Sequence, residues 1–375
     1  MAQIINEVSR TFNEFLLLPN RTRTDCSAAT VDLRTPLVRH IVGEASAIEL
    51  GTPFTSAIMQ AVSTPELAVA LAREGGLSFL HHNQPIADQV AAVRQVKRAE
   101  AGAEGAGPLR VGAGINTHDY RERVPALLAA GTDALCFDSS DGYSDWQAQA
   151  LSWVRKEYPQ IPVGGGNVVD GEAFTFLAEA GADFVKVGVG GGSICITRDQ
   201  KGIGRGQASA VLDVAAARDA FRERTGAHVP ICSDGGLAHD YHVALALAMG
   251  ADFVMMGRYF ARFDQAAGAK VPTGDGFVKE YWGEGSNRAR NWRRYGQGGQ
   301  GLVFEEGVDG YVPYAGDLHE GLALTVAKLR NTMVSCGSTT LPRFRSSARL
   351  TLVSDQSFQE SHATVTLRDA PVPVA

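Results

Sequence analysis

The chain has 375 residues, of which 45% are hydrophobic and 20% are charged, the composition of an ordinary folded protein with a large core. Its formal net charge of -6 provides no overall basic field that would attract nucleic acid. No apolar run reaches the length of a membrane span, and the N-terminal residues lack the basic start and apolar core of a signal peptide, so we expect a cytoplasmic protein.

Eight short apolar runs follow one another from residue 54, and amphipathic stretches typical of helices separate them. The runs lie at 54–59, 77–81, 109–114, 133–138, 161–166, 184–189, 229–234 and 252–257. Eight strands that alternate with helices predict an α/β fold, a closed (β/α)8 TIM barrel of parallel strands. The alternative architecture is an open, doubly wound sheet.

Four of the helical stretches end in glycine just before the next predicted strand, where glycine commonly ends a helix. They cover 66–76, 121–131, 171–181 and 241–250. Two other segments interrupt the alternation. Residues 99–110 form a short linker of small residues, and residues 258–318 are far longer than an ordinary barrel loop. Loops this long are usually lids or disordered. We expect 258–318 to be the excursion that carries an active-site flap after the eighth strand, within one domain that spans 1–375.

The five cysteines are scattered, with no zinc-site spacing and no even count that would favour a disulfide framework. Cys136 and Cys232 lie in apolar runs and are expected to be buried. Cys195 instead lies in GGGSICITR, directly after the run 184–189. Barrel enzymes hold their active sites in the loops after the strands, and a thiolate is a nucleophile. The motif therefore indicates either a catalytic cysteine or a tight turn that contains one incidentally.

Asp234 ends the run 229–234 in the motif SDGG. Its carboxylate is suited either to accept hydrogen bonds from the two hydroxyls of a ribose or to cap the next helix, and the residues alone leave both open. The backbone N–H groups of Gly235 and Gly236 can bind phosphate, as can Gly257 after the eighth strand. Phosphate sites in the last two loops are common in barrels.

Arg293, Arg294 and Tyr295 lie in NWRRYGQGG, within the expected flap. A basic run is typical of a solvated face, but its place beside glycines on a long excursion also suits a group that enters the site during turnover. The histidines without ligand spacing are expected to be structural or surface residues: His40, His228, His242 and His319.

Together these motifs resemble the inosine 5′-monophosphate (IMP) dehydrogenase and guanosine monophosphate (GMP) reductase superfamily. The resemblance is carried by GGGSICITRDQKGIGRGQ, SDGG, MMGRYFA and KEYWGEGS, and it extends from TFNEFLLLP near the start to VTLRD near the end. The details of SICITRDQKGIGRGQ, GRYFARF and RARNWRRY are similar to the protozoan-type branch of the dehydrogenase. The resemblance implies a homotetramer that oxidises IMP with NAD in guanine nucleotide biosynthesis.

It also implies a two-stage reaction. Cys195 would attack C2 of the purine, and hydride would pass from C2 to NAD, leaving a covalent thioimidate. After NADH departs and the flap closes, water would hydrolyse this adduct to xanthosine monophosphate (XMP). Thr197 would help to activate the water, Arg294 and Tyr295 would form the flap dyad with Arg294 as base, and Glu306 would contact the purine and assist the proton relay.

The resemblance further implies three sets of binding residues. For IMP they are Met59, Ser193, Asp234, Gly236, Gly257, Arg258, Tyr281, Glu284, Gly285 and Glu306. For NAD they are Asp138, Ser139, Ser140, Asn167, Gly188 and Gly190. A potassium ion would bind the carbonyls of Gly190, Gly192 and Cys195, and Glu360, Ser361 and His362 of a neighbouring subunit would complete its shell.

Most dehydrogenases of the family carry two CBS regulatory modules between the second helix and third strand, where this chain has only AEAGAEGAGPLR. Nucleotide regulation through such modules is therefore not expected, and whether they were deleted or are naturally missing stays open. GMP reductase also lacks the modules, but it needs no flap base such as RRY. A non-catalytic nucleotide-binding barrel would keep Asp234 without needing Cys195, Thr197 and Arg294 together.

Overall fold

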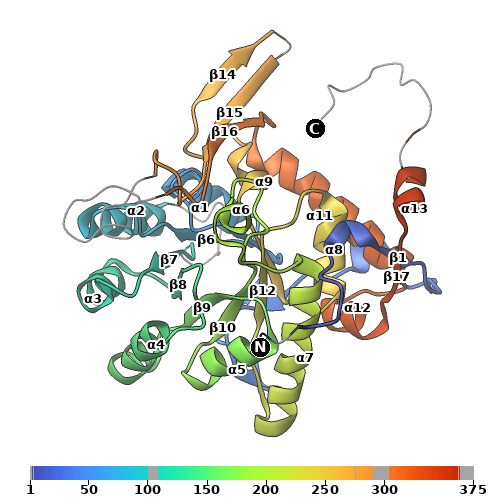
Figure 1. Ribbon diagram of the computed structural model, residues 1–375, viewed down its shortest axis with the longest axis horizontal. Helices are drawn as coiled ribbons and strands as arrows, with labels where there is room; N and C mark the ends of the chain where they lie inside the picture. The colour runs from blue at the N-terminus through green and yellow to red at the C-terminus, as the bar shows by residue number, and fades with distance from the viewer. Residues whose placement is uncertain are drawn as a thin grey trace.

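The computed structural model describes residues 2, 4–99, 109–274, 276–289, 304–361 and 363. Eight parallel strands close into a barrel, around which the helices are arranged (Figure 1). The first and last of these strands pair in parallel, with Phe54 opposite Val254, so the sheet has no open edge. The predicted TIM barrel is therefore confirmed, and the open, doubly wound sheet is wrong. The barrel strands are β5 (Phe54–Ser56), β6 (Leu77–Leu80), β7 (Gly112–Ile115), β8 (Ala134–Phe137), β9 (Val163–Val168), β10 (Phe184–Val187), β12 (Ile231–Asp234) and β13 (Phe253–Met256).

The helices begin and end where their local sequence favours it. The Thr64 hydroxyl accepts from the Leu67 N–H at the start of α1, and Gly131 ends α3 in the left-handed conformation with a φ of 96°. No described helix meets the length and apolarity needed to cross a membrane. The helices are α1 (Pro65–Arg73), α2 (Ile86–Arg98), α3 (Tyr120–Ala130), α4 (Asp145–Glu157), α5 (Gly171–Glu179), α6 (Thr197–Lys201), α7 (Gln207–Thr225), α8 (Asp240–Ala248), α9 (Arg258–Ala261), α11 (Leu318–Ser335), α12 (Leu341–Ser347) and α13 (Asp355–Glu360).

The N-terminal residues close the barrel at the end where its strands begin. Strands β2 (Thr35–Pro36) and β4 (Glu49–Leu50) pair. Leu50 and the apolar residues between the two strands, Leu37, Val38 and Ile48, join Phe79, Phe184 and Phe253 in one buried cluster inside the barrel. The predicted burial of Cys136 and Cys232 is confirmed, because both belong to this cluster and are fully buried. There are two further antiparallel pairs: β1 (Phe15–Leu18) with β17 (Arg349–Leu352), which joins segments near the two ends of the chain, and β3 (His40–Ile41) with β11 (Ala227–His228).

The excursion after the last barrel strand contains regular structure of its own. Strands β14 (Lys270–Thr273), β15 (Gly276–Trp282) and β16 (Asp309–Pro313) form an antiparallel sheet that projects from the barrel (Figure 1). The sequence predicted a flap here but not this sheet. Most of the flap's basic motif, and most of the predicted linker 99–110, lie outside the described residues.

Candidate active site

A cavity of about 480 Å³ opens at the carboxyl ends of the barrel strands. Nearly every residue that the sequence predicts for catalysis or ligand binding lines it. These are Met59, Asp138, Ser139, Ser140, Asn167, Gly188, Gly190, Gly192, Ser193, Cys195, Thr197, Asp234, Gly236, Gly257, Arg258, Tyr281, Glu284, Gly285 and Glu306. They come from strands and loops far apart in the sequence, and the closed barrel brings their carboxyl ends to one rim.

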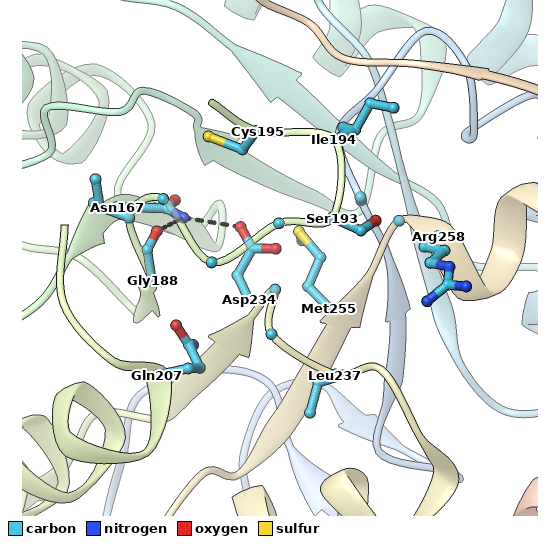
Figure 2. A pocket seen from close by; sticks show the side chains of 18 of the residues that line it. Asn167, Gly188, Ser193, Ile194, Cys195, Gln207, Asp234, Leu237, Met255 and Arg258 are labelled. Atoms are coloured by element: carbon cyan, nitrogen blue, oxygen red, sulfur yellow. Dashed lines mark hydrogen bonds between the residues drawn. The ribbon is translucent and has the colours of Figure 1, made fainter. Parts of the chain in front are cut away.

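The cysteine loop folds back on itself and is pinned to a second loop (Figure 2). The Cys195 N–H donates to the Gly192 carbonyl at 3.1 Å, so this is a tight turn. The Ile196 N–H donates to the Glu306 carbonyl, and the Val308 N–H donates to the Ile194 carbonyl, both at 3.0 Å. The cysteine is thus both in a tight turn and on the cavity wall, and the second loop carries Glu306 to its side.

A short polar chain starts at the cysteine thiol. The Cys195 Sγ lies 3.1 Å from the Thr197 Oγ1, and the Thr197 hydroxyl donates to the Glu306 carboxylate at 3.1 Å. The Lys201 ammonium lies 3.6 Å from the other oxygen of that carboxylate. A hydroxyl that contacts both a thiol and a carboxylate can pass a proton between the space above the thiol and the carboxylate.

Asp234 does not cap the next helix, because α8 begins six residues later and follows His239. Its carboxylate faces the cavity, where Asn167 donates to it at 2.9 Å and Lys186 at 2.7 Å (Figure 2). The same Asn167 amide donates to the Gly188 carbonyl, and its own buried Oδ1 has no partner among the described residues. The wall therefore offers a carboxylate to the hydroxyl and amide donors of a ligand.

Glycines allow the backbone to approach the ligand space closely. A Cβ on Gly188, which has a φ of 141°, would lie 2.1 Å from the Asp234 carbonyl oxygen. A Cβ on Gly257 would lie 2.7 Å from the Tyr281 hydroxyl and 3.1 Å from the Met59 sulfur. Burial raises the pKa of Tyr281, which keeps the hydroxyl a neutral donor beside Ser193. Only glycine fits at Gly188, and a side chain at Gly257 would have to displace Tyr281 and Met59.

A second cavity of about 260 Å³ adjoins the first. The two share Asp138, Ser139, Ser140 and Glu306 in their walls. A ligand with two joined halves could therefore lie across both, with Asp138 at the junction.

Some predicted residues are not in this cavity. Glu360 ends α13 and Ser361 follows it, and neither lines the cavity of its own chain. Arg293, Arg294, Tyr295 and His362 lie outside the described residues. Within the described part of the chain, no three His, Cys, Asp or Glu side chains gather as a metal site.

Sequence reasoning missed other residues that line the cavity: Thr11, Phe12, Asn13, Lys186, Gln207 and His242. The Nε2 of His242 lies 2.8 Å from the Asn13 Oδ1, and its Nδ1 accepts from the Ala238 N–H at 3.1 Å. This histidine therefore joins the N-terminal segment to the loop that follows Asp234. The sequence held one signal for Lys186, a charged residue inside an otherwise apolar strand.

Fold and cavity together define a class: a TIM-barrel protein with a cysteine, a carboxylate and a glycine-rich loop on the wall of a cavity at the carboxyl ends of its strands. Comparison with known proteins identifies the family within this class. The model of the IMP dehydrogenase / GMP reductase domain matches residues 9–364, and the chain belongs to that family.

Several curated relatives resemble the chain over nearly their whole length. The inosine-5′-monophosphate dehydrogenase of Tritrichomonas foetus is 41% identical, with 97% of this chain and 97% of that protein covered. That of Haemophilus influenzae is 28% identical, with 96% and 97% covered. The GMP reductase of Ascaris suum is 31% identical, with 95% and 96% covered. The Tritrichomonas alignment spans 488 residues, more than the 375 of this chain, so that relative carries a stretch with no counterpart here.

Proposed function

We propose that this protein is an IMP dehydrogenase, which oxidises IMP to XMP with NAD in guanine nucleotide biosynthesis. The observation that carries the proposal is the chain from the Cys195 thiol through Thr197 to Glu306, with both contacts at 3.1 Å. A dehydrogenase of this kind needs a nucleophile and, within reach of the same carbon, a route for the proton of a hydrolytic water. The similarity to the Tritrichomonas dehydrogenase over nearly the whole chain supports it.

In the first stage, the Cys195 thiolate forms a bond to C2 of the purine. Hydride leaves C2 with its two electrons, and NAD is the acceptor that takes it up. Asp234 would accept from the ribose hydroxyls of IMP, and the backbone of Gly236 and Gly257, with Arg258, would hold the phosphate. Holding the nucleotide at both its ribose and its phosphate would place C2 over the sulfur.

In the second stage, water attacks C2 and the bond to sulfur breaks. The water's proton passes to a base, and XMP leaves. Thr197 and Glu306 provide one route for this proton. The flap pair Arg294 and Tyr295 would provide the main base in the place that the departing dinucleotide leaves. An arginine can act as base only where the site stabilises its neutral form, because its pKa in water lies above about 12.

The second cavity suits the dinucleotide. Asp138, Ser139 and Ser140 line both cavities and can accept from the hydroxyl and amide groups of the dinucleotide. A potassium ion would be held by the carbonyls of Gly190 and Gly192 and by that of Cys195, since carbonyl oxygens are the ligands that replace its water shell. The proposal extends to a cytoplasmic homotetramer in which Glu360, Ser361 and His362 of a neighbour complete this shell.

GMP reductase is the second candidate, because the Ascaris enzyme is similar over nearly the whole chain. The two reactions change absorbance at 340 nm in opposite directions. The purified protein should raise it with IMP and NAD and leave it unchanged with GMP and NADPH. A fall with GMP and NADPH would identify a reductase. No change with either pair, in a protein that binds IMP, would leave a non-catalytic nucleotide-binding barrel.

A further inference from the structure

Lys186 is a charged side chain inside the barrel. It lies on β10, it is only 2% exposed, and its ammonium lies 2.8 Å from Asp138 and 2.7 Å from Asp234. Burial alone would lower the pKa of this lysine, but the two carboxylates outweigh burial and raise it well above its ordinary value. Lys186 is therefore a permanent cation shared by two anions.

The two carboxylates face different ligand spaces. Asp234 lines the first cavity only, whereas Asp138 lines the wall that both cavities share. Asp234 is the last residue of β12 and Asp138 directly follows β8, and these two strands are not neighbours in the barrel. The side chains of Asp234 and Asp138 are 18% and 15% exposed and line the cavity wall, while Lys186 is 2% exposed and bridges them.

An ion pair elsewhere in the barrel shows what a purely structural lysine looks like. Lys97 contacts one carboxylate, that of Asp133, and the Leu109 carbonyl. Asp133 precedes β8, at the end of the barrel away from the cavity, and neither residue lines either cavity. Lys186 differs because both of its partners lie on ligand-binding walls.

We propose that Lys186 is a positioning residue that couples the substrate and cofactor sites, by holding the IMP carboxylate Asp234 and the NAD carboxylate Asp138 on one ammonium. The inference rests on the proposed function. If one carboxylate is neutralised, the Lys186 ammonium interacts more strongly with the remaining carboxylate. There it competes with the ribose hydroxyls for the lone pairs of that carboxylate. A change on one ligand's wall should therefore alter the affinity for the other ligand.

The test is a cross-effect in binding. All variants carry Cys195→Ala, so that IMP and NAD bind without reacting, and calorimetry gives each dissociation constant. Asp138→Asn should weaken IMP binding roughly threefold to tenfold, the size expected for groups in one ion-pair network, and Asp234→Asn should weaken NAD binding similarly. With Lys186→Met added, Asp138→Asn should no longer affect IMP. Asp133→Asn and Lys97→Met are matched controls and should change neither constant.

The outcomes separate this inference from the proposed function. If the Cys195→Ala parent binds neither IMP nor NAD, the proposed function fails, and the inference fails with it. If the parent binds both but Asp138→Asn leaves IMP affinity unchanged, the coupling is overturned and the function stands. If Lys186→Met does not fold, Lys186→Arg replaces it and must change both constants. If Lys186→Arg changes only one of the two dissociation constants, Lys186 serves a single ligand and the coupling is overturned.

Discussion

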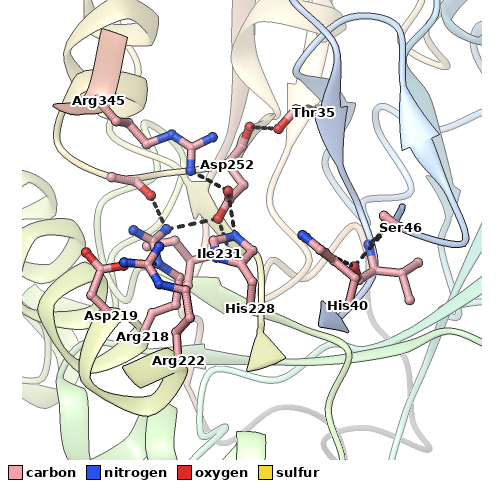
Figure 3. Close-up of polar contacts among 12 residues, drawn as sticks. Thr35, His40, Ser46, Arg218, Asp219, Arg222, His228, Ile231, Asp252 and Arg345 are labelled. Carbon is pink, nitrogen blue, oxygen red and sulfur yellow. Dashed lines mark hydrogen bonds and ion pairs between the residues drawn. The ribbon is translucent and has the colours of Figure 1, made fainter. Parts of the chain in front are cut away.

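Replacing Asp252 by asparagine should destabilise the barrel strongly. This carboxylate is fully buried just before β13, whereas the cavity lies at the carboxyl ends of the strands. Figure 3 shows the side chains that surround it. One oxygen contacts His228 at 3.0 Å and Arg345 at 2.6 Å, and the other contacts Arg218 at 3.0 Å. Burial alone would raise the pKa of Asp252, but Arg345, His228 and Arg218 hold it well below its usual range. The residue is therefore an anion that several buried donors require.

The loss of unfolding free energy can be judged against two other aspartates, Asp133 and Asp183, which also lie just before a barrel strand. All three aspartates are the third residue of a Gly-Thr-Asp or Gly-Ala-Asp sequence. Each carboxylate accepts from one backbone N–H near the start of the neighbouring strand, that of Val111, Val163 or Ile231. Neutralising Asp252 leaves the Arg345 guanidinium without its anion and leaves Arg218 with only the more exposed Asp219, so it should cost about 3–5 kcal/mol. The Asp133 pair with Lys97 is more exposed, at 24% and 20%, and should cost about 1 kcal/mol or less.

The cost of replacing Asp183 by asparagine should lie between the costs at Asp252 and Asp133. Its partner Arg155 is 30% exposed, and burial raises the pKa of Asp183 despite that arginine, so the neutral form is less unfavourable here than at Asp252. We expect a loss of about 2 kcal/mol, as for a hydrogen bond to a charged group.

Urea unfolding followed by circular dichroism at pH 7 measures all three Asp→Asn variants. The free energies of unfolding are compared through the midpoints at a common slope. The folded Asp252→Asn variant should keep its IMP affinity, because the change lies at the far end of the barrel. If its midpoint falls no further than that of Asp133→Asn, burial and shared partners do not set the energies of these ion pairs, and the reasoning is wrong.

Three further predictions concern the site. Cys195→Ala should abolish turnover and keep IMP binding, measured by calorimetry, and turnover near the parent rate would exclude the thiol as nucleophile. Arg294→Ala should give a stopped-flow burst of about one NADH per active site and then a slow steady rate, and a burst slowed as much as the steady rate would contradict the two-stage flap. Burial lowers the pKa of His242 to about 4. Because an unfolded histidine titrates near 6.5, stability should be lost as pH falls from about 6.5 to 4, by up to about 3 kcal/mol, and His242→Gln should flatten the urea midpoint over this range.

The barrel was predictable because buried parallel strands are continuous apolar runs and the loops after them are polar. The ends of strands were less certain. The run 161–166 becomes Val163–Val168, in which a Cβ on Gly164 would lie 2.1 Å from the Phe184 ring. Glycine is a poor strand residue alone, and here the neighbouring strand's aromatic ring fills the space that a side chain would occupy. The sequence of one strand does not show which side chain of a neighbouring strand will fill the space beside its glycines.

The sequence predicted neither the sheet β14–β16 nor the part of the cavity wall formed by Thr11, Phe12 and Asn13, because both depend on residues far apart in the chain. Strand β16 begins at Asp309, more than twenty-five residues after β15 ends, so no tight-turn signal joins them. Asn13 contacts His242 across more than two hundred residues, and neither side chain has a local pattern that indicates the other. Both features depend on long-range packing.

The sequence also contains enough information to place Asp138, Lys186 and Asp234 on the inner face of the barrel. Successive side chains of a strand point to opposite faces, so residues two apart share a face. Cys136, Phe184 and Cys232 all belong to the buried cluster inside the barrel, and two positions after each stands Asp138, Lys186 or Asp234. Once the barrel is assigned, this period alone places two carboxylates and one ammonium on the inward face, just above the apolar layer. What it cannot give is the pairing, because the 2.8 Å and 2.7 Å contacts depend on how far β8, β10 and β12 are staggered against one another.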